Sequence, residues 1–129
     1  MLRTKSIHSP KEPSVDGLRI LAARFRGRGL TSDHYDVWMP NLGPSELLLN
    51  DFRSEKITWA EFSRRYARQI RENPPLDREN RLIKNHGQKF TLRLLQHLAN
   101  TQRITLLCHC AEDEKHCHRH LLKRLIERA

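Results

Sequence analysis

The densest group of side chains that could carry chemistry lies near the end of the sequence. Three cysteines and four histidines fall between residues 108 and 120. Thiolate sulfur and imidazole nitrogen are the ligands that zinc and other borderline-soft metals prefer. Cys108 lies inside an apolar run, where a free cysteine often packs as a small core residue. The candidate ligands for zinc or iron are therefore Cys110, Cys117, His109 and His116.

A second interpretation of the same segment is an anion site. Cys117, His118 and Arg119 lie near an expected helix start that follows a strand. Free N–H groups and the helix dipole concentrate positive potential at such a position, and an arginine can bind phosphate with two parallel hydrogen bonds. The same field would give Cys117 thiolate character. The alternative is that Arg119 only neutralises charge locally.

A basic cluster earlier in the chain favours the same kind of ligand. In an extended segment, Arg24, Arg26 and Arg28 project to one side, and two glycines let a ligand approach the backbone. Three guanidinium groups would suit a phosphate-bearing molecule, although a solvated loop is an equally simple explanation. The residues that could act on such a ligand are Cys110, Cys117, His8 and Ser9.

The elements that must position these residues alternate between strands and helices. Strands are predicted near Lys5–Ser9, Leu18–Phe25 and Arg103–Cys110. Along the last strand, Cys108 and Cys110 share one face while His109 points to the other. Helices are predicted from residue 46, from residue 59, over Gln88–Ala99 and from about Glu114. This order predicts one α/β domain over residues 1–129, a small three-layer fold whose mostly parallel sheet is covered by helices.

Local signals set the expected helix starts and buried faces. Ser45 and Thr58 are expected to be N-caps, and Thr58 forms a capping box with Glu61. Asp113 is the expected N-cap of the last helix. The residues expected to face inward are Trp59, Phe62, Tyr66 and Ile70 in one helix and Phe90, Leu94, Leu95 and Leu98 in the next.

Composition limits the class of protein. The 129 residues are 37% apolar and carry a net charge of +9. A basic excess favours an anionic partner, either a phosphate-bearing small molecule or a nucleic acid. No stretch approaches the ~20 apolar residues of a membrane span, so no membrane partner is expected. Three cysteines do not suit a disulfide-stapled secreted domain, which makes the cytoplasm the expected location.

Several ordered motifs resemble a known family. They are Ser6-Ile7-His8-Ser9-Pro10, Asp16-Gly17-x-Arg19-Ile20-Leu21, Arg26-Gly27-Arg28-Gly29-Leu30, Asp36-x-Trp38, Leu42-Gly43-Pro44-Ser45 and Trp59-x2-Phe62-x2-Arg65-Tyr66. Together they resemble the family catalogued as domain of unknown function 488, in its YeaO-like branch. The strand ending at Cys108 and the Cys117-His118-Arg119 helix start resemble another branch of that family. The resemblance implies a compact three-layer α/β fold and no settled activity.

These observations leave three functional hypotheses. The first is a phosphate-bearing small molecule or nucleotide bound in a cleft lined by arginine, histidine and cysteine, with Arg24, Arg26, Arg28, His118 and Arg119 as its ligand-binding residues. The second is a metal-binding or thiol-redox module, and the third is a nucleic-acid-binding module. The sequence does not decide between an enzyme and a binding protein.

Overall fold

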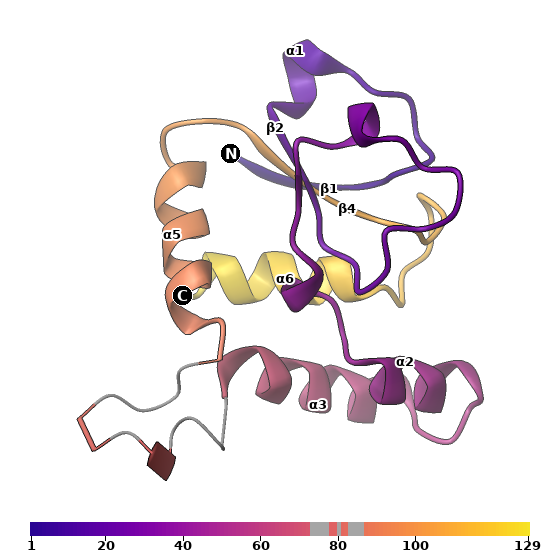
Figure 1. The fold of residues 1–129 in the computed structure, drawn as a ribbon, viewed down its shortest axis with the longest axis vertical. Coiled ribbons are helices and arrows are strands. Elements are labelled where there is room, and N and C mark those ends of the chain that lie inside the picture. The colour runs from indigo at the N-terminus through magenta and orange to yellow at the C-terminus, as the bar shows by residue number, and fades with distance from the viewer. Residues whose placement is uncertain (73–77, 80, 83–86) are drawn as a thin grey trace.

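The protein folds around a small parallel β-sheet (Figure 1). The computed structural model describes residues 1–72, 78–79, 81–82 and 87–129. Within these ranges the strands lie in the order β1-β4-β2-β3, and all pairs are parallel. The bounds are Leu2–Ser6 for β1, Leu18–Leu21 for β2, Val37–Trp38 for β3 and Ile104–Cys108 for β4. The predicted α/β class with a parallel sheet is confirmed.

Strand β4 lies between β1 and β2 and is buried along its whole length. Its last residue, Cys108, is the register partner of Ser6 in β1, and Leu107 is the partner of Leu21 in β2. A continuous apolar run of this kind is typical of a strand covered on both faces. Because the three strands are parallel and in register, the segments that leave them emerge side by side at one edge of the sheet.

Helices cover one face of the sheet (Figure 1). Helix α6 (His118–Glu127) packs on β1 and β4, α3 (Trp59–Arg71) and α5 (Lys89–Ala99) contact α6, and α2 (Glu46–Arg53) contacts α3. None of the described helices is long and apolar enough to cross a membrane. The main core between this layer and the sheet is made of Ile20, Ala22, Leu42, Leu48, Phe62, Tyr66, Ile70, Leu92, Leu95, Ile104, Leu106, Leu122, Leu125 and Ile126.

The other face of the sheet has a thinner cover. It consists of the short helix α1 (Pro13–Asp16) and of loops that contain the 3₁₀ turn η1 (Ser32–His34). A second 3₁₀ turn, η2 (Pro40–Leu42), contributes Leu42 to the core on the helical side. A smaller buried cluster lies on this side, made of Ile7, Leu21, Ala23 and Leu107. Alternation along β4 therefore sends Leu106 and Cys108 towards the helices and Leu107 towards the loops.

A buried ion cluster holds α1 to this second face. The carboxylate of Asp16 is fully buried, lies 3.2 Å from Lys5 Nζ and accepts a hydrogen bond from the buried Arg19 guanidinium. Thr105 Oγ1 in β4 donates to the Asp16 carbonyl oxygen at 2.7 Å. Burial acts to raise the pKa of Asp16, but the Glu12 N–H and the two cations outweigh it and hold that pKa below its ordinary value.

Several local predictions are confirmed and others are wrong. Ser45 and Thr58 each accept an N-cap hydrogen bond. The last helix begins at His118, not near Glu114, because residues 111–116 form turns; its N-cap is therefore Cys117 and not Asp113. In α5, Leu92 and Leu95 are buried, while Phe90 and Leu94, both predicted to face inward, are 50% and 57% exposed.

The strand bounds shift for a related reason. Strand β1 begins at Leu2 and ends at Ser6, earlier than the predicted Lys5–Ser9. Its register with the buried strand β4 sets these limits, and residues 7–9 already turn away from the sheet. Strands β2 and β4 end at Leu21 and Cys108, earlier than the predicted Phe25 and Cys110, so the glycine-rich loop and Cys110 lie beyond the strand ends.

Candidate functional site

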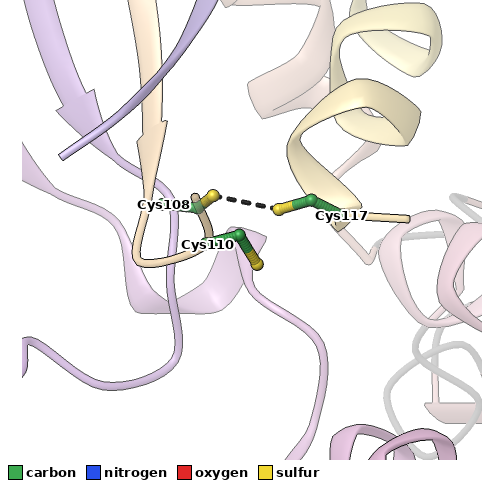
Figure 2. Close-up of side chains that lie close together, drawn as sticks. All are labelled: Cys108, Cys110 and Cys117. Atoms are coloured by element: carbon green, nitrogen blue, oxygen red, sulfur yellow. Dashed lines mark hydrogen bonds between the residues drawn. The ribbon is translucent and has the colours of Figure 1, made fainter. Parts of the chain in front are cut away.

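Strand β4 and helix α6 bring three thiols together at the carboxyl edge of the sheet. Cys108 is the last residue of β4, Cys110 follows in the turn, and Cys117 is the N-cap residue of α6. Their three Sγ atoms lie within 4.8 Å of one another. All three are free cysteines, and the sulfurs of Cys108 and Cys117 are 2.9 Å apart (Figure 2). Cys108 and Cys117 are buried, whereas Cys110 is partly exposed.

A buried guanidinium lies against this cysteine cluster. Arg119 is fully buried, and its Nη1 donates to Cys108 Sγ at 2.8 Å. Its Nη2 donates to the carbonyl oxygens of Ala111 and Glu112 at 3.1 and 2.9 Å. The Glu112 carboxylate lies 3.9 Å from Arg119 Nη2, but that side chain is 54% exposed. A buried cation needs a nearby anion, so the sulfurs are the natural place for the compensating negative charge.

The three thiols do not hold their protons equally. Hydrogen bonds from Cys108 and Cys117 lower the pKa of Cys110, and the positive charge of Arg119 adds to this effect. The hydrogen bond with Cys110, together with burial, raises the pKa of Cys108 to about 11. Hydrogen bonds and burial also raise the pKa of Cys117. These shifts favour a negative charge on Cys110, the most exposed of the three sulfurs.

His118 lies at the edge of the cysteine cluster. It is 8% exposed, its Nε2 is hydrogen-bonded to the carbonyl oxygen of Ala22, and its Nδ1 is 4.0 Å from Cys117 Sγ. Burial lowers the pKa of His118 and keeps the imidazole neutral. Because Nε2 must donate to a carbonyl oxygen, the proton is on Nε2 and the lone pair is on Nδ1, the atom nearer the sulfur.

The two histidines predicted as metal ligands point elsewhere. His109 Nε2 is 2.8 Å from the Phe25 carbonyl oxygen, on the opposite side of β4 from the thiols. His116 is exposed, and its ring stacks on Trp59 with centroids 4.8 Å apart. Cys110 and Cys117 do lie together, as predicted. The third thiol of the cluster is Cys108, which was predicted to be a core residue. The shared face of Cys108 and Cys110 on a strand was the signal that could have included it.

A pocket of about 360 Å³ opens beside the partly exposed sulfur. Side chains from α2, α3 and the turn before α6 form its walls, and the sulfur-side residues Cys110, Cys117 and His118 line it as well. The other lining residues are Leu49, Phe52, Arg53, Phe62, Ala111, Glu114 and His116. A molecule in this pocket would reach the cysteine cluster from the helical face of the sheet.

The predicted arginine cluster divides between structural and exposed roles. Arg24 donates to the carbonyl oxygens of Pro44 and Gly43 at 3.0 and 2.9 Å, so it ties the loop after β2 to the start of α2. Arg26 and Arg28 are exposed and make no ion pair or side-chain hydrogen bond within the described residues. Arg119, as described above, is used internally.

A second pocket, of about 550 Å³, lies at the same edge on the loop-covered face. Four of the predicted site residues line it: His8, Ser9, Arg28 and His109. Ser9 Oγ donates to Glu112 Oε1 at 2.6 Å. The candidates predicted for one cleft are therefore separated, because consecutive residues after β4 turn to opposite faces: His109 to this pocket and Cys110 to the other. Arg24, Arg26 and Arg119 line neither pocket.

Comparison with known proteins places the chain in a family. The model of the active DUF488-N3 subclade matches residues 2–129. The uncharacterised protein YeaO of Escherichia coli K12 is 29% identical over 102 residues, which cover 78% of this chain and 85% of that protein. No solved structure shows significant similarity to the chain. The match over nearly the whole chain confirms the resemblance noted in the sequence, and the protein belongs to the DUF488 family, a family of uncharacterised function.

Proposed function

We propose that the cysteine cluster binds a soft divalent metal ion, with zinc as the first choice and iron as the second. The observation that carries the proposal is the convergence of three sulfurs within 4.8 Å at the end of β4. With Zn–S bonds of about 2.3 Å, tetrahedral geometry separates two ligand sulfurs by roughly 3.8 Å. The cluster is close to this size, and Cys108 and Cys117 need only move apart from their 2.9 Å contact.

The charges around the cluster support a metal thiolate centre. Three thiolates and one divalent ion carry a net charge of −1, which matches the single positive charge of the buried Arg119. Its Nη1 already donates to Cys108 Sγ at 2.8 Å, and hydrogen bonds of this kind stabilise ligands around a metal. The same guanidinium would be an uncompensated buried charge if all three thiols were protonated.

His118 is the residue suited to be the fourth ligand. A ligating histidine usually donates its other ring N–H to a carbonyl or carboxylate, and His118 Nε2 is hydrogen-bonded to the Ala22 carbonyl oxygen. Its Nδ1 is 4.0 Å from Cys117 Sγ, so a small movement of the ring would complete a set of three sulfurs and one nitrogen. Tetrahedral sites with this donor set favour zinc over octahedral, oxygen-preferring metals.

The decisive experiment measures metal binding by purified, reduced protein. We expect close to one zinc per chain by elemental analysis. Replacement by Co²⁺ should give sulfur-to-cobalt charge-transfer absorption that disappears in Cys108→Ser and Cys117→Ser. His118→Asn should weaken zinc binding roughly 10- to 100-fold, while the matched control His116→Asn should not. Wild-type protein that binds neither ion after full reduction would overturn the proposal.

The variants also separate the ligands from one another. If the cysteine variants lose the metal but His118→Asn keeps its full affinity, the three-sulfur site stands and the role of His118 is wrong. The fourth position would then belong to a molecule in the pocket of about 360 Å³ next to Cys110. That result would change the site from a closed, structural type to an open type in which a substrate can reach the metal.

Thiol redox chemistry is a second candidate, favoured by the 2.9 Å contact between Cys108 and Cys117. A peroxide would accept two electrons and two protons from the two thiols as its O–O bond breaks, giving a disulfide together with two waters from hydrogen peroxide, or one alcohol and one water from an alkyl hydroperoxide. Mass spectrometry of peroxide-treated protein, with and without zinc, tests this reaction. A disulfide that forms only in the metal-free protein supports it, whereas unchanged thiols in both samples would exclude it.

The predicted phosphate-bearing ligand and the cytoplasmic location remain proposals. Free thiols suit a reducing compartment. Arg24 and Arg119 donate to carbonyl oxygens and sulfur, which leaves the exposed arginines as the residues able to bind an anion. Nucleic acid stays an alternative partner, because the net charge of +9 favours any polyanion.

A further inference from the structure

The second pocket at the carboxyl edge of the sheet lies on the side away from the thiols. Segments from three neighbouring strands form it: His8 follows β1, Gly27–Leu30 follow β2, and His109 follows β4. In open parallel sheets, ligands bind beyond the carboxyl ends of the strands. A volume of about 550 Å³ is also in the ordinary range for small-molecule sites.

The lining of this pocket is basic. Lys11 and Arg28 provide two fixed positive charges against one carboxylate, that of Asp33, and three imidazoles belong to His8, His34 and His109. Lys11 Nζ donates to the Asp33 carbonyl oxygen at 3.0 Å. The hydrogen bond from Thr31 and the charge of Lys11 help to lower the pKa of the Asp33 carboxylate. This leaves Arg28 as the uncompensated cation of the pocket among the described residues. The Asp33 carboxylate accepts a hydrogen bond from Thr31 and lies 3.4 Å from His34 Nδ1. The Arg28 guanidinium makes no ion pair or side-chain hydrogen bond within the described residues.

The glycine-rich loop lets the backbone come close to the pocket. Gly27 and Gly29 have φ values of 92° and 74°, a region that side chains disfavour. A Cβ on Gly27 would lie 2.8 Å from the His109 ring, while a Cβ on Gly29 would meet nothing within 4 Å. The loop therefore packs tightly on His109 at one point and leaves open space at the next, beside Arg28.

We infer that this pocket binds the phosphate group of a small phosphorylated molecule, with Arg28 as its principal contact and Lys11 and the imidazoles beside it. A planar guanidinium binds phosphate through two parallel hydrogen bonds. The inference is independent of the metal centre, because no residue that lines this pocket is one of the proposed metal ligands. Ligand binding here should survive the loss of metal from the other side of β4.

The test is calorimetric titration with pyrophosphate and with adenosine diphosphate at low salt. Arg28→Gln should weaken binding about tenfold or more, as expected for the loss of a charged hydrogen-bonding partner. Arg26→Gln is the matched control. It removes one positive charge two residues before Arg28, and the Arg26 side chain does not line the pocket. That variant should bind within about twofold of the wild type.

Three results would overturn the inference. Equal losses in the Arg26 and Arg28 variants would show non-specific attraction to a basic surface. A lack of binding of both probes at millimolar concentration would show that no phosphate site exists. Binding of a short single-stranded oligonucleotide that depends on Arg28, with no binding of either small probe, would assign the pocket to nucleic acid. Cys108→Ser protein should bind both probes as the wild type does, which would show that phosphate binding does not depend on the metal site.

Discussion

The two sides of the β4 carboxyl end differ in how their charges are balanced. On the helical side, Arg119 is fully buried and its hydrogen bonds go to a sulfur and to carbonyl oxygens. On the loop side, Arg28 is exposed and has no partner within the described residues. A buried cation is part of the fold, since its counter-charge must be present when the chain folds. An exposed cation at a pocket costs little to maintain and is available to a ligand.

Removal of the buried cation should have the largest effect. We expect Arg119→Ala to lower the free energy of unfolding by about 3–5 kcal/mol, because it leaves the Cys108 sulfur and the carbonyl oxygens of Ala111 and Glu112 without their hydrogen-bond donor and removes the positive charge beside the cysteine cluster. Arg28→Ala should change it by less than about 0.5 kcal/mol. Urea denaturation of both variants measures the difference. Similar small losses in the two would show that Arg119 is not needed to balance charge.

A methyl group added at Gly27 should affect the pocket on the loop side and leave the cysteine cluster unchanged. Gly27→Ala places a Cβ 2.8 Å from the His109 ring at a φ of 92°, and strain of this kind costs about 1–3 kcal/mol. We expect weaker pyrophosphate binding and an unchanged cobalt spectrum. Gly29→Ala is the control for backbone strain, because its Cβ meets nothing within 4 Å. A changed cobalt spectrum in Gly27→Ala would mean that the two pockets are not separate.

Alkylation should distinguish the three thiols. Because the pKa of Cys110 is lowered and those of Cys108 and Cys117 are raised, reduced metal-free protein should react with iodoacetamide first at Cys110, more than about tenfold faster. Because its pKa is lowered, Cys110 should remain a thiolate at neutral pH. Its alkylation rate should fall only when the pH is lowered well below the ordinary pKa of a thiol. Peptide mapping over a pH series measures this. Bound zinc should protect all three, and equal rates would contradict the charge assignment.

Salt should give the smallest contrast. Exposed charges are screened over a Debye length that is ~10 Å at 0.1 M ionic strength. Pyrophosphate binding at Arg28 should therefore weaken several-fold between ~50 and ~200 mM salt, whereas zinc affinity should hardly change. Titrations at several potassium chloride concentrations compare the two. An equal salt dependence of zinc and pyrophosphate binding would contradict the comparison, because it would show that the metal site depends on exposed charges as much as the pocket at Arg28 does.

The sequence predicted features that depend on near neighbours. Ser45 and Thr58 are caps because each accepts from an N–H three residues along the chain. The apolar run before Cys108 predicted a strand, and β4 is buried along its whole length. Sequence reasoning placed the last helix too early because Glu114 and Lys115 are good helix formers, while tertiary contacts of Arg119 hold residues 110–112 in a turn.

The site was harder to predict because its partners are distant in the sequence. Arg24 was grouped with Arg26 and Arg28 by spacing, but its acceptors are carbonyl oxygens 19 and 20 residues away. Cys108 resembled a core residue, and its contacts with Cys117 and Arg119 show a different environment. His116 was placed near the thiols by its neighbours in the chain, yet its ring stacks on Trp59 from α3. No pattern among neighbouring residues in the sequence indicates any of these contacts.

The alternation at the end of β4 restricts how this protein can change. His109 and Cys110 are adjacent in the chain and serve opposite faces of the sheet. Insertion or deletion of one residue within Ile104–Cys108 would exchange the faces, turning thiols towards the basic pocket and an imidazole towards Arg119. The length of this strand is therefore fixed by two sites at once. The turn of residues 111–116 belongs to no strand or helix, so a change of length there would not exchange the two faces. It should be tolerated best between Glu112, which accepts from Ser9, and His116, which stacks on Trp59.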